Sequence, residues 1–106
     1  MLSHAVYFSL KDRSPAAVKA LVHACETYLS GHPGTVSLSV GTVASYDRQV
    51  NDRDFDVALE IVFESHAAHD IYQTAERHNQ FIAEQAPNWA KVRVFDVDLA
   101  SHHPPA

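Results

Sequence analysis

The chain has 106 residues, 46% of them hydrophobic and 20% charged, which fits one folded domain rather than a disordered or fibrous protein. Its 13 acidic and 8 basic side chains give a net charge of −5, which argues against nucleic acid or an anionic membrane surface as a partner because both attract basic surfaces. One cysteine excludes an internal disulfide framework, and no apolar run reaches the roughly 20 residues of a spanning helix, so we expect a cytoplasmic protein.

The first part of the chain predicts a strand, a helix and a second strand. Residues 4–10 alternate between apolar and other side chains, with many aromatic and β-branched residues, as a strand does. Ser14 is a plausible N-cap for a helix whose apolar residues recur every three or four positions until about Ser30. Gly31 suits the left-handed position that often follows a helix. Residues 35–43 alternate again and predict the second strand.

The second part predicts a loop, a strand, an interrupted helix and a final strand. Residues 44–54 are polar and irregular, whereas residues 55–63 form the most regular apolar alternation in the chain. Ser65 is expected to cap a helix, and Thr74 to cap a second helical segment after a break in the chain at about this position. The last strand is expected at about residues 90–98.

The resulting order, βαββαβ, predicts an α+β, ferredoxin-like fold with a four-stranded antiparallel sheet and both helical regions on one face. The first and last strands carry apolar groups on both faces, for example Phe8 and Tyr7 on the first. Helices can cover only one face, so the other would expose a large apolar patch. We therefore predict a homodimer packed sheet to sheet, a dimeric α/β barrel. Residues 1–100 are assigned to this single domain, and residues 101–106 are expected to be a disordered tail.

Five segments of the sequence, in this order and at these separations, are similar to those of a known protein family. They are HAVYFSLKD, PGTVSLSVG, FDVALEIVFES, the Y-x5-H-x2-F run that starts at Tyr72, and VRVFDVD. Together they cover nearly the whole chain and resemble the stress-responsive α/β-barrel (Dabb) family. The resemblance implies a dimeric ferredoxin-like α/β barrel, in agreement with the dimer predicted from the strand faces. The best-defined enzymes of this family are plant polyketide cyclases such as olivetolic acid cyclase. They use a histidine and a tyrosine for an aldol condensation, without metal or organic cofactor.

The resemblance also implies three site residues. Tyr72 and His78 match the helix tyrosine and histidine of the cyclase, and His4 matches the histidine at the start of its first strand. A further strand histidine of the family is replaced by Val57, and the usual His-Pro-x-His stretch keeps only its last histidine, His78. In one unbroken helix, Tyr72 and His78 would lie about 120° apart, so they converge only if the helix breaks.

Two interpretations of the three residues remain open. If Tyr72 and His78 converge, His78 can act as a general base on a C–H beside a carbonyl, and Tyr72 can donate a hydrogen bond to the enolate oxygen. Otherwise Tyr72 packs in the core and His78 bonds a backbone carbonyl. His4 either lines the mouth of the same pocket or is a hydrogen-bonded residue at the rim of the core.

The function favoured by these observations is a stress-responsive homodimer that binds a small organic molecule between sheet and helices, with no cofactor and an otherwise undefined role. The two missing family histidines favour binding over catalysis. A cofactor-independent cyclase, aldol-type lyase or isomerase with a His–Tyr pair is the first alternative. A dimeric-barrel monooxygenase, suggested by fold analogy, is the second.

Eight histidines are many for an acidic chain of this length. His66 and His69 have the i, i+3 spacing of a metal-binding pair, but only Asp70 stands nearby as a third ligand, so we expect no metal site. Six histidines are interpreted as surface residues without a role: His23, His32, His66, His69, His102 and His103.

Four further side chains receive structural interpretations. Cys25 lies on the apolar stripe of the first helix and is expected to behave as a small hydrophobic residue. Trp89 is expected to anchor the helix–sheet junction or the dimer. Glu60 faces the predicted dimer side of its strand, and Arg93 is its candidate ion-pair partner.

Overall fold

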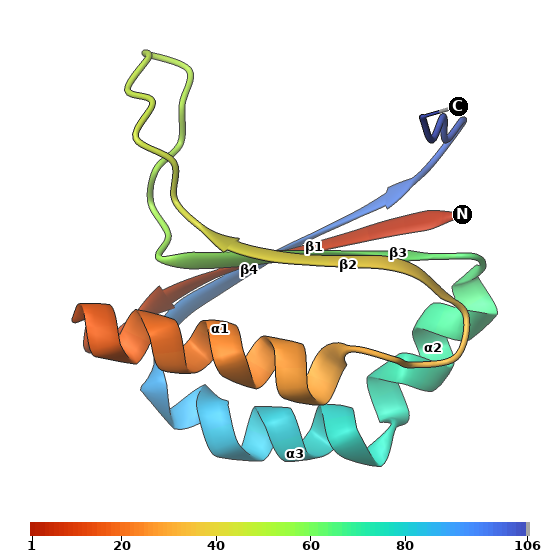
Figure 1. Cartoon of the computed structure of the whole chain (residues 1–106), viewed down its shortest axis with the longest axis horizontal. Coiled ribbons are helices and arrows are strands. Elements are labelled where there is room, and N and C mark those ends of the chain that lie inside the picture. Colours follow the sequence, from red (N-terminus) through yellow and green to blue (C-terminus); the bar gives the residue numbers. More distant parts are fainter. Residues whose placement is uncertain (106) are drawn as a thin grey trace.

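The computed structural model describes residues 1–105, which form one antiparallel sheet with helices on one of its faces (Figure 1). The strand order is β2-β3-β1-β4, so the predicted ferredoxin-like α+β fold is confirmed. None of the helices in residues 1–105 is long and apolar enough to cross a membrane. The elements are β1 (Leu2–Leu10), α1 (Pro15–Leu29), β2 (Thr35–Thr42), β3 (Val57–Phe63), α2 (His66–Thr74), α3 (Glu76–Gln85), the 3-10 turn η1 (Ala86–Asn88) and β4 (Trp89–Asp98).

The helix starts follow local capping chemistry. The Ser14 hydroxyl accepts a hydrogen bond from the Ala17 amide, as predicted. The predicted break in the second helical region is also confirmed, because α2 ends at Thr74 and α3 begins at Glu76. Thr74 is not its cap, however, and this part of the prediction is wrong. Ala75 occupies the junction, and the Thr74 hydroxyl instead donates back to the Ile71 carbonyl, a local bond that competes with capping.

β3 begins at Val57, two residues later than the alternation predicts. Phe55 donates its amide to the Arg53 carbonyl in a tight turn, and its ring packs on Tyr7 with 5.0 Å between centroids. It therefore leaves the apolar face to which it was assigned. The buried Asp56 lies just before β3, where its amide donates to the Phe8 carbonyl and its carboxylate accepts hydrogen bonds from the Leu10 amide and from Arg13. These contacts hold the start of β3 against the end of β1.

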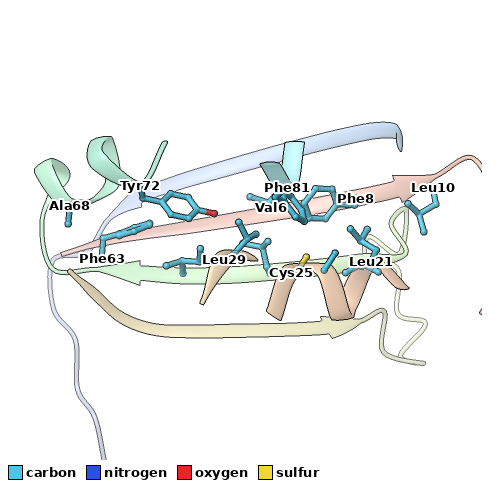
Figure 2. Close-up of a cluster of buried hydrophobic side chains, with 14 residues drawn as sticks. Val6, Phe8, Leu10, Leu21, Cys25, Leu29, Phe63, Ala68, Tyr72 and Phe81 are labelled. Atoms are coloured by element: carbon cyan, nitrogen blue, oxygen red, sulfur yellow. The ribbon is translucent and has the colours of Figure 1, made fainter. Parts of the chain in front are cut away.

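The hydrophobic core lies between the helices and the sheet face that they cover (Figure 2). Cys25 is fully buried within it, and burial raises the pKa of its thiol to about 12, so it is a core residue, as predicted. Burying each large side chain contributes about 1.5–3 kcal/mol. The largest fully buried side chains are Phe8, Phe63, Leu21, Leu29, Ile61 and Val57.

One glycine sets how closely the start of β2 approaches α2. Gly34 has a φ of +79°, in the left-handed region, and a Cβ at this position would overlap the Cβ of Ala68. Only glycine meets both requirements without strain. Gly31 also has a positive φ, +75°, but a Cβ there would meet no atom. The joint between β2 and α2 therefore depends on Gly34 in particular.

The other face of the sheet is not covered by any helix of the described chain (Figure 1). Tyr7 and Phe95 pack edge to face across it, with centroids 5.7 Å apart, and Phe95 is 51% exposed. The predicted Glu60–Arg93 pair is wrong. Arg93 bonds Asp52 at 2.8 Å, because the loop after β2 brings that carboxylate over β4, and Glu60 accepts from Ser3.

The C-terminal end of the chain continues beyond β4 without a helix or strand in residues 101–105. Residue 106, the last of the predicted tail, lies outside the described residues. The assignment of one domain to residues 1–100 and of disorder to residues 101–106 stays a prediction.

Candidate functional site

A cavity of about 140 Å³ lies on the helix-covered side of the sheet, where β1 and β4 meet the end of α2 and α3. Its walls are mostly apolar and come from three strands of the sheet and from all three helices. The three predicted site residues, His4, Tyr72 and His78, all line it, together with Gln73 and Trp89. The structure thus brings the three residues together around one space.

The helix break accounts for this convergence. Tyr72 belongs to the last turn of α2 and His78 to the first turn of α3, on either side of Ala75. Their ring centroids lie 4.7 Å apart, with an edge-on angle of 68° between the rings. Tyr72 is buried, and Figure 2 shows its hydroxyl directed inward, toward the middle of the core cluster. The geometry is that of the converging pair, not of two residues on separate helix faces.

The surroundings set the protonation states of both groups. Burial lowers the pKa of His78 below its ordinary value of 6.5, and the neighbouring His4, His32 and His69 lower it further. Its imidazole is therefore neutral at neutral pH and can accept a proton. Burial raises the pKa of the Tyr72 phenol above its ordinary value of 10, so Tyr72 remains a hydrogen-bond donor.

Two residues that line the cavity each carry a buried polar atom without a partner. The buried Nδ1 of His78 and the buried Nε1 of Trp89 have no hydrogen bond within residues 1–105. Leaving such an atom unsatisfied costs about 1–3 kcal/mol, so each needs an explanation. Trp89 also packs on Phe8 and Phe81, with centroids 4.9 and 5.7 Å away. It anchors the helix–sheet junction, as predicted, and it is also one of the residues that line the cavity.

His4 lies at the end of the cavity nearest α2. It is 5% exposed, and its Nδ1 lies 2.5 Å from Oδ1 of Asp96, the residue that faces it across the β1–β4 pair. Its ring centroid is 6.1 Å from that of Tyr72 and 5.2 Å from that of His69. His4 is therefore both a lining residue and a hydrogen-bonded residue, which combines the two interpretations left open by the sequence.

Two histidines interpreted as surface residues belong to this cluster, so the interpretation is wrong for them. His69 packs edge-on against His4 and Phe63. His32 is buried, its ring lies 5.0 Å from that of Tyr72, and its Nε2 donates to the Tyr28 carbonyl. His69 precedes Tyr72 by three positions, the spacing of one helix face, and this signal was available in the sequence. His32 follows a helix end, where no periodicity indicates burial.

A second hollow, of about 270 Å³, lies on the open face of the sheet and is lined by Tyr7, Asp52, Phe55, Arg93 and Phe95. Its polar groups already bond one another, since Arg93 donates both to Asp52 and to the Asp54 carbonyl. It also lies on the face predicted to meet a second copy. The smaller cavity is therefore the stronger candidate for a ligand.

The fold and the cavity define the class of protein: a ferredoxin-like α+β domain with a pocket between sheet and helices. Residues 2–99 match the family model of the stress responsive A/B barrel domain, and the chain belongs to this family, Dabb. No curated protein matches it in sequence.

Several solved structures share the fold. A Dabb family protein from Mesorhizobium loti with a ferredoxin-like fold is 20% identical, with a TM-score of 0.78 over 94% of this chain and 97% of that one. The hydroxynitrile lyase from Passiflora edulis is 21% identical, with a TM-score of 0.75 over 97% and 96% of the two chains. A dimeric ferredoxin-like protein of unknown function from Thermobifida fusca is 19% identical, with a TM-score of 0.75 over 92% and 90%.

Proposed function

We propose that this Dabb protein is a homodimer that binds a small, partly polar organic molecule in the cavity formed by His4, Tyr72, His78 and Trp89. The observation that carries the proposal is the pair of unpartnered buried atoms, His78 Nδ1 and Trp89 Nε1, on residues that line one cavity. A ligand that bonds both atoms removes the desolvation penalty of each.

The cavity also restricts the ligand. Its volume of about 140 Å³ is less than half of the roughly 300 Å³ at which sites for drug-sized ligands begin. A single ring or a short chain fits this space. The indole N–H of Trp89 requires an acceptor such as a carbonyl oxygen, and the neutral imidazole of His78 accepts a bond from a hydroxyl or an acidic C–H. The proposed ligand class is therefore a small hydroxy-carbonyl or enolisable carbonyl compound.

The homodimer is proposed from the open face of the sheet. Phe95 and Val97 are both about half exposed there, and no helix covers them. The Thermobifida fusca protein, which has the same fold, is described as dimeric. Packing two such faces together buries these side chains and closes an α/β barrel between the subunits.

A second candidate function is a cofactor-independent lyase, cyclase or isomerase, favoured by the contact between Tyr72 and His78. His78 takes the proton from a carbon beside a carbonyl group, and the electron pair of the broken C–H bond moves into the enolate. Tyr72, still protonated, donates a hydrogen bond to the enolate oxygen. The hydroxynitrile lyase from Passiflora edulis shares this fold, which shows that the fold is compatible with lyase chemistry.

Binding can be tested with intrinsic fluorescence, since Trp89 is the only tryptophan. A panel of small enolisable carbonyl compounds is titrated into the wild type and into two variants. We expect a saturable change in wild-type emission, affinity at least about tenfold lower in His78→Ala, and unchanged affinity in His23→Ala, whose side chain is exposed on α1. Equal affinity in wild type and His78→Ala, or no saturable change with any compound, would contradict the proposal.

Catalysis requires a separate assay. Exchange of the α-hydrogen of a bound compound in D2O, followed by NMR, reports proton abstraction directly. We expect exchange with the wild type and its loss in His78→Ala. In Tyr72→Phe, ligand binding should persist while exchange slows about a hundredfold, within the range for loss of one oxyanion donor. Binding without exchange in the wild type would reject the enzyme and retain the binding protein.

A further inference from the structure

We propose that His4, His69 and Asp96 bind one divalent transition-metal ion beside the cavity. The three residues come from β1, α2 and β4, and each offers one ligating atom, with all three atoms within 4.8 Å of one another. The sequence gives no sign of this cluster, because 27 positions separate His69 from Asp96 and only the fold joins them.

The donor set selects the kind of ion. Two imidazoles and one carboxylate suit zinc, iron, cobalt or nickel, whereas magnesium and calcium prefer sites of oxygen ligands alone. Three protein ligands also leave at least one coordination position open, as in catalytic rather than structural zinc sites. A metal at this position would therefore remain accessible to a second molecule.

The distances are within reach of a metal site. Ligating atoms around a tetrahedral zinc ion lie roughly 3.3 Å apart, given metal–ligand bonds of about 2.0 Å. His4 Nδ1 and Asp96 Oδ1 are 2.5 Å apart, joined by a hydrogen bond, so an ion replaces the shared proton with a small separation of the two groups. The ligand atom of His69 lies within 4.8 Å of the other two, and a change in its side-chain torsions can adjust that spacing.

The orientation of His69 matches that of a metal ligand. Its Nδ1 lies 3.1 Å from Oδ1 of Asp70, a bond in which the ring donates and which fixes the tautomer with Nε2 unprotonated. Gln73 Nε2 lies 3.3 Å from that Nε2 and donates into its lone pair. The nitrogen is thus held ready to coordinate, and the ion displaces the Gln73 amide.

Access and burial also fit. The His4 side chain is 7% exposed, whereas the Asp96 side chain is 44% exposed. One side of the cluster is therefore buried and rigid, and the other is open for an ion to enter. Because His4 and Gln73 also line the cavity, an ion here lies at its end. Polarisation of a ligand's carbonyl oxygen by this ion rests on the proposed function, whereas metal binding itself does not.

The His66–Asp98 pair provides a matched control for variants of the proposed metal site. His66, at the start of α2, and Asp98, at the end of β4, form a similar histidine–carboxylate contact of 2.5 Å. The two side chains are 69% and 75% exposed, and neither belongs to the three-residue cluster. Substitution of His66 therefore removes an imidazole from the same region between α2 and β4 and leaves the three proposed metal ligands in place.

The test is a titration of the full chain, free of any affinity tag, with Co²⁺ alone, followed by the visible absorption of the bound ion. We expect one equivalent to bind per chain, with Zn²⁺ displacing it. Affinity should fall at least about a hundredfold in His69→Ala and Asp96→Asn, and about tenfold in Asp70→Asn, which changes only the hydrogen bond behind a ligand. His66→Ala should bind Co²⁺ like the wild type.

Three results would overturn the proposal: no saturable binding of Co²⁺ by the wild type up to millimolar concentration, wild-type affinity in both His69→Ala and Asp96→Asn, or loss of binding in His66→Ala. Circular dichroism of the metal-free variants checks that each is folded, and Asp96→Asn keeps both the size and the half-exposed position of the side chain. Fluorescence titration of carbonyl compounds in EDTA separates the two proposals, since ligand binding and Co²⁺ binding are then measured independently.

Discussion

The two faces of the sheet are built from the same strands and have opposite surroundings. On β1, Phe8 faces the helices and is 2% exposed, whereas Tyr7, its neighbour, lies on the face without helices. On β4, Phe95 lies on that open face and is 51% exposed. The helix-covered face holds the buried core and the cavity, although Val94 at its β4 edge is 50% exposed. The open face carries aromatic rings without a cover, and this difference is the physical basis for the proposed dimer.

The largest expected effect on stability comes from a substitution on the helix-covered face. Phe8→Ala removes a ring that packs against Phe81 and Trp89 and should lower the free energy of unfolding by about 3–5 kcal/mol. Ile71→Ala, at a side chain 62% exposed on α2, should change it by less than about 1 kcal/mol. Chemical denaturation monitored by circular dichroism measures both. A loss below about 1 kcal/mol for Phe8→Ala would show that this face is not the closed core.

The joint between β2 and α2 should be the next most sensitive position. Gly34→Ala combines a left-handed φ with an overlap at Ala68 and should cost about 2–4 kcal/mol, the sum of backbone strain and overpacking. Gly31→Ala has the same strain without the overlap and should cost about 1–2 kcal/mol. Thermal unfolding of the two variants compares them directly. Equal losses would indicate that Ala68 moves aside at little cost.

The role of the open face is tested by measuring the oligomeric state of the protein and of variants on this face. Phe95→Asp places a charge in the proposed interface and should raise the dimer dissociation constant at least about tenfold, equivalent to about 1.4 kcal/mol, while leaving the monomer folded. Ile71→Asp, on α2 away from this face, is the matched control and should remain dimeric. Sedimentation equilibrium gives the masses. A monomeric wild type, or a Phe95→Asp variant as dimeric as the wild type, would contradict a sheet-to-sheet interface.

The smallest expected effect is a pH dependence of stability from the cavity. The pKa of His78 is lowered in the folded chain, chiefly by burial and then by His4, His32 and His69, while Tyr72 is protonated and uncharged. The unfolded chain therefore binds the proton more readily, and the free energy of unfolding should fall as the pH drops below 6.5. His78→Asn should make this decrease shallower. An identical pH profile in the variant would show that His78 does not contribute.

Local features were predictable from sequence, and contacts across the fold were not. The N-cap at Ser14 and the break near Thr74 depend on neighbours within a few residues, so the pattern reveals them. Asp96 could not be predicted from sequence, because its contact with His4 depends on the β1–β4 register that places the two residues opposite each other. His32 was missed because its burial results from the packing of a turn against Tyr72.

The candidate site was predictable only in part for the same reason. Tyr72, His78 and His4 follow from a family resemblance, and their convergence around one cavity follows from the helix break. The unpartnered Nε1 of Trp89 could not be predicted. The sequence around a tryptophan that precedes a strand does not indicate whether its indole N–H has a hydrogen-bond partner.

The most direct test of the proposed function is the ¹⁵N NMR signal of the Trp89 indole, the single such signal in this chain because it has one tryptophan. A small carbonyl ligand that accepts a hydrogen bond from Nε1 should move this signal downfield and slow its exchange with solvent, with no comparable change in His78→Ala. An indole signal that stays unchanged while a ligand binds elsewhere on the chain would contradict the account.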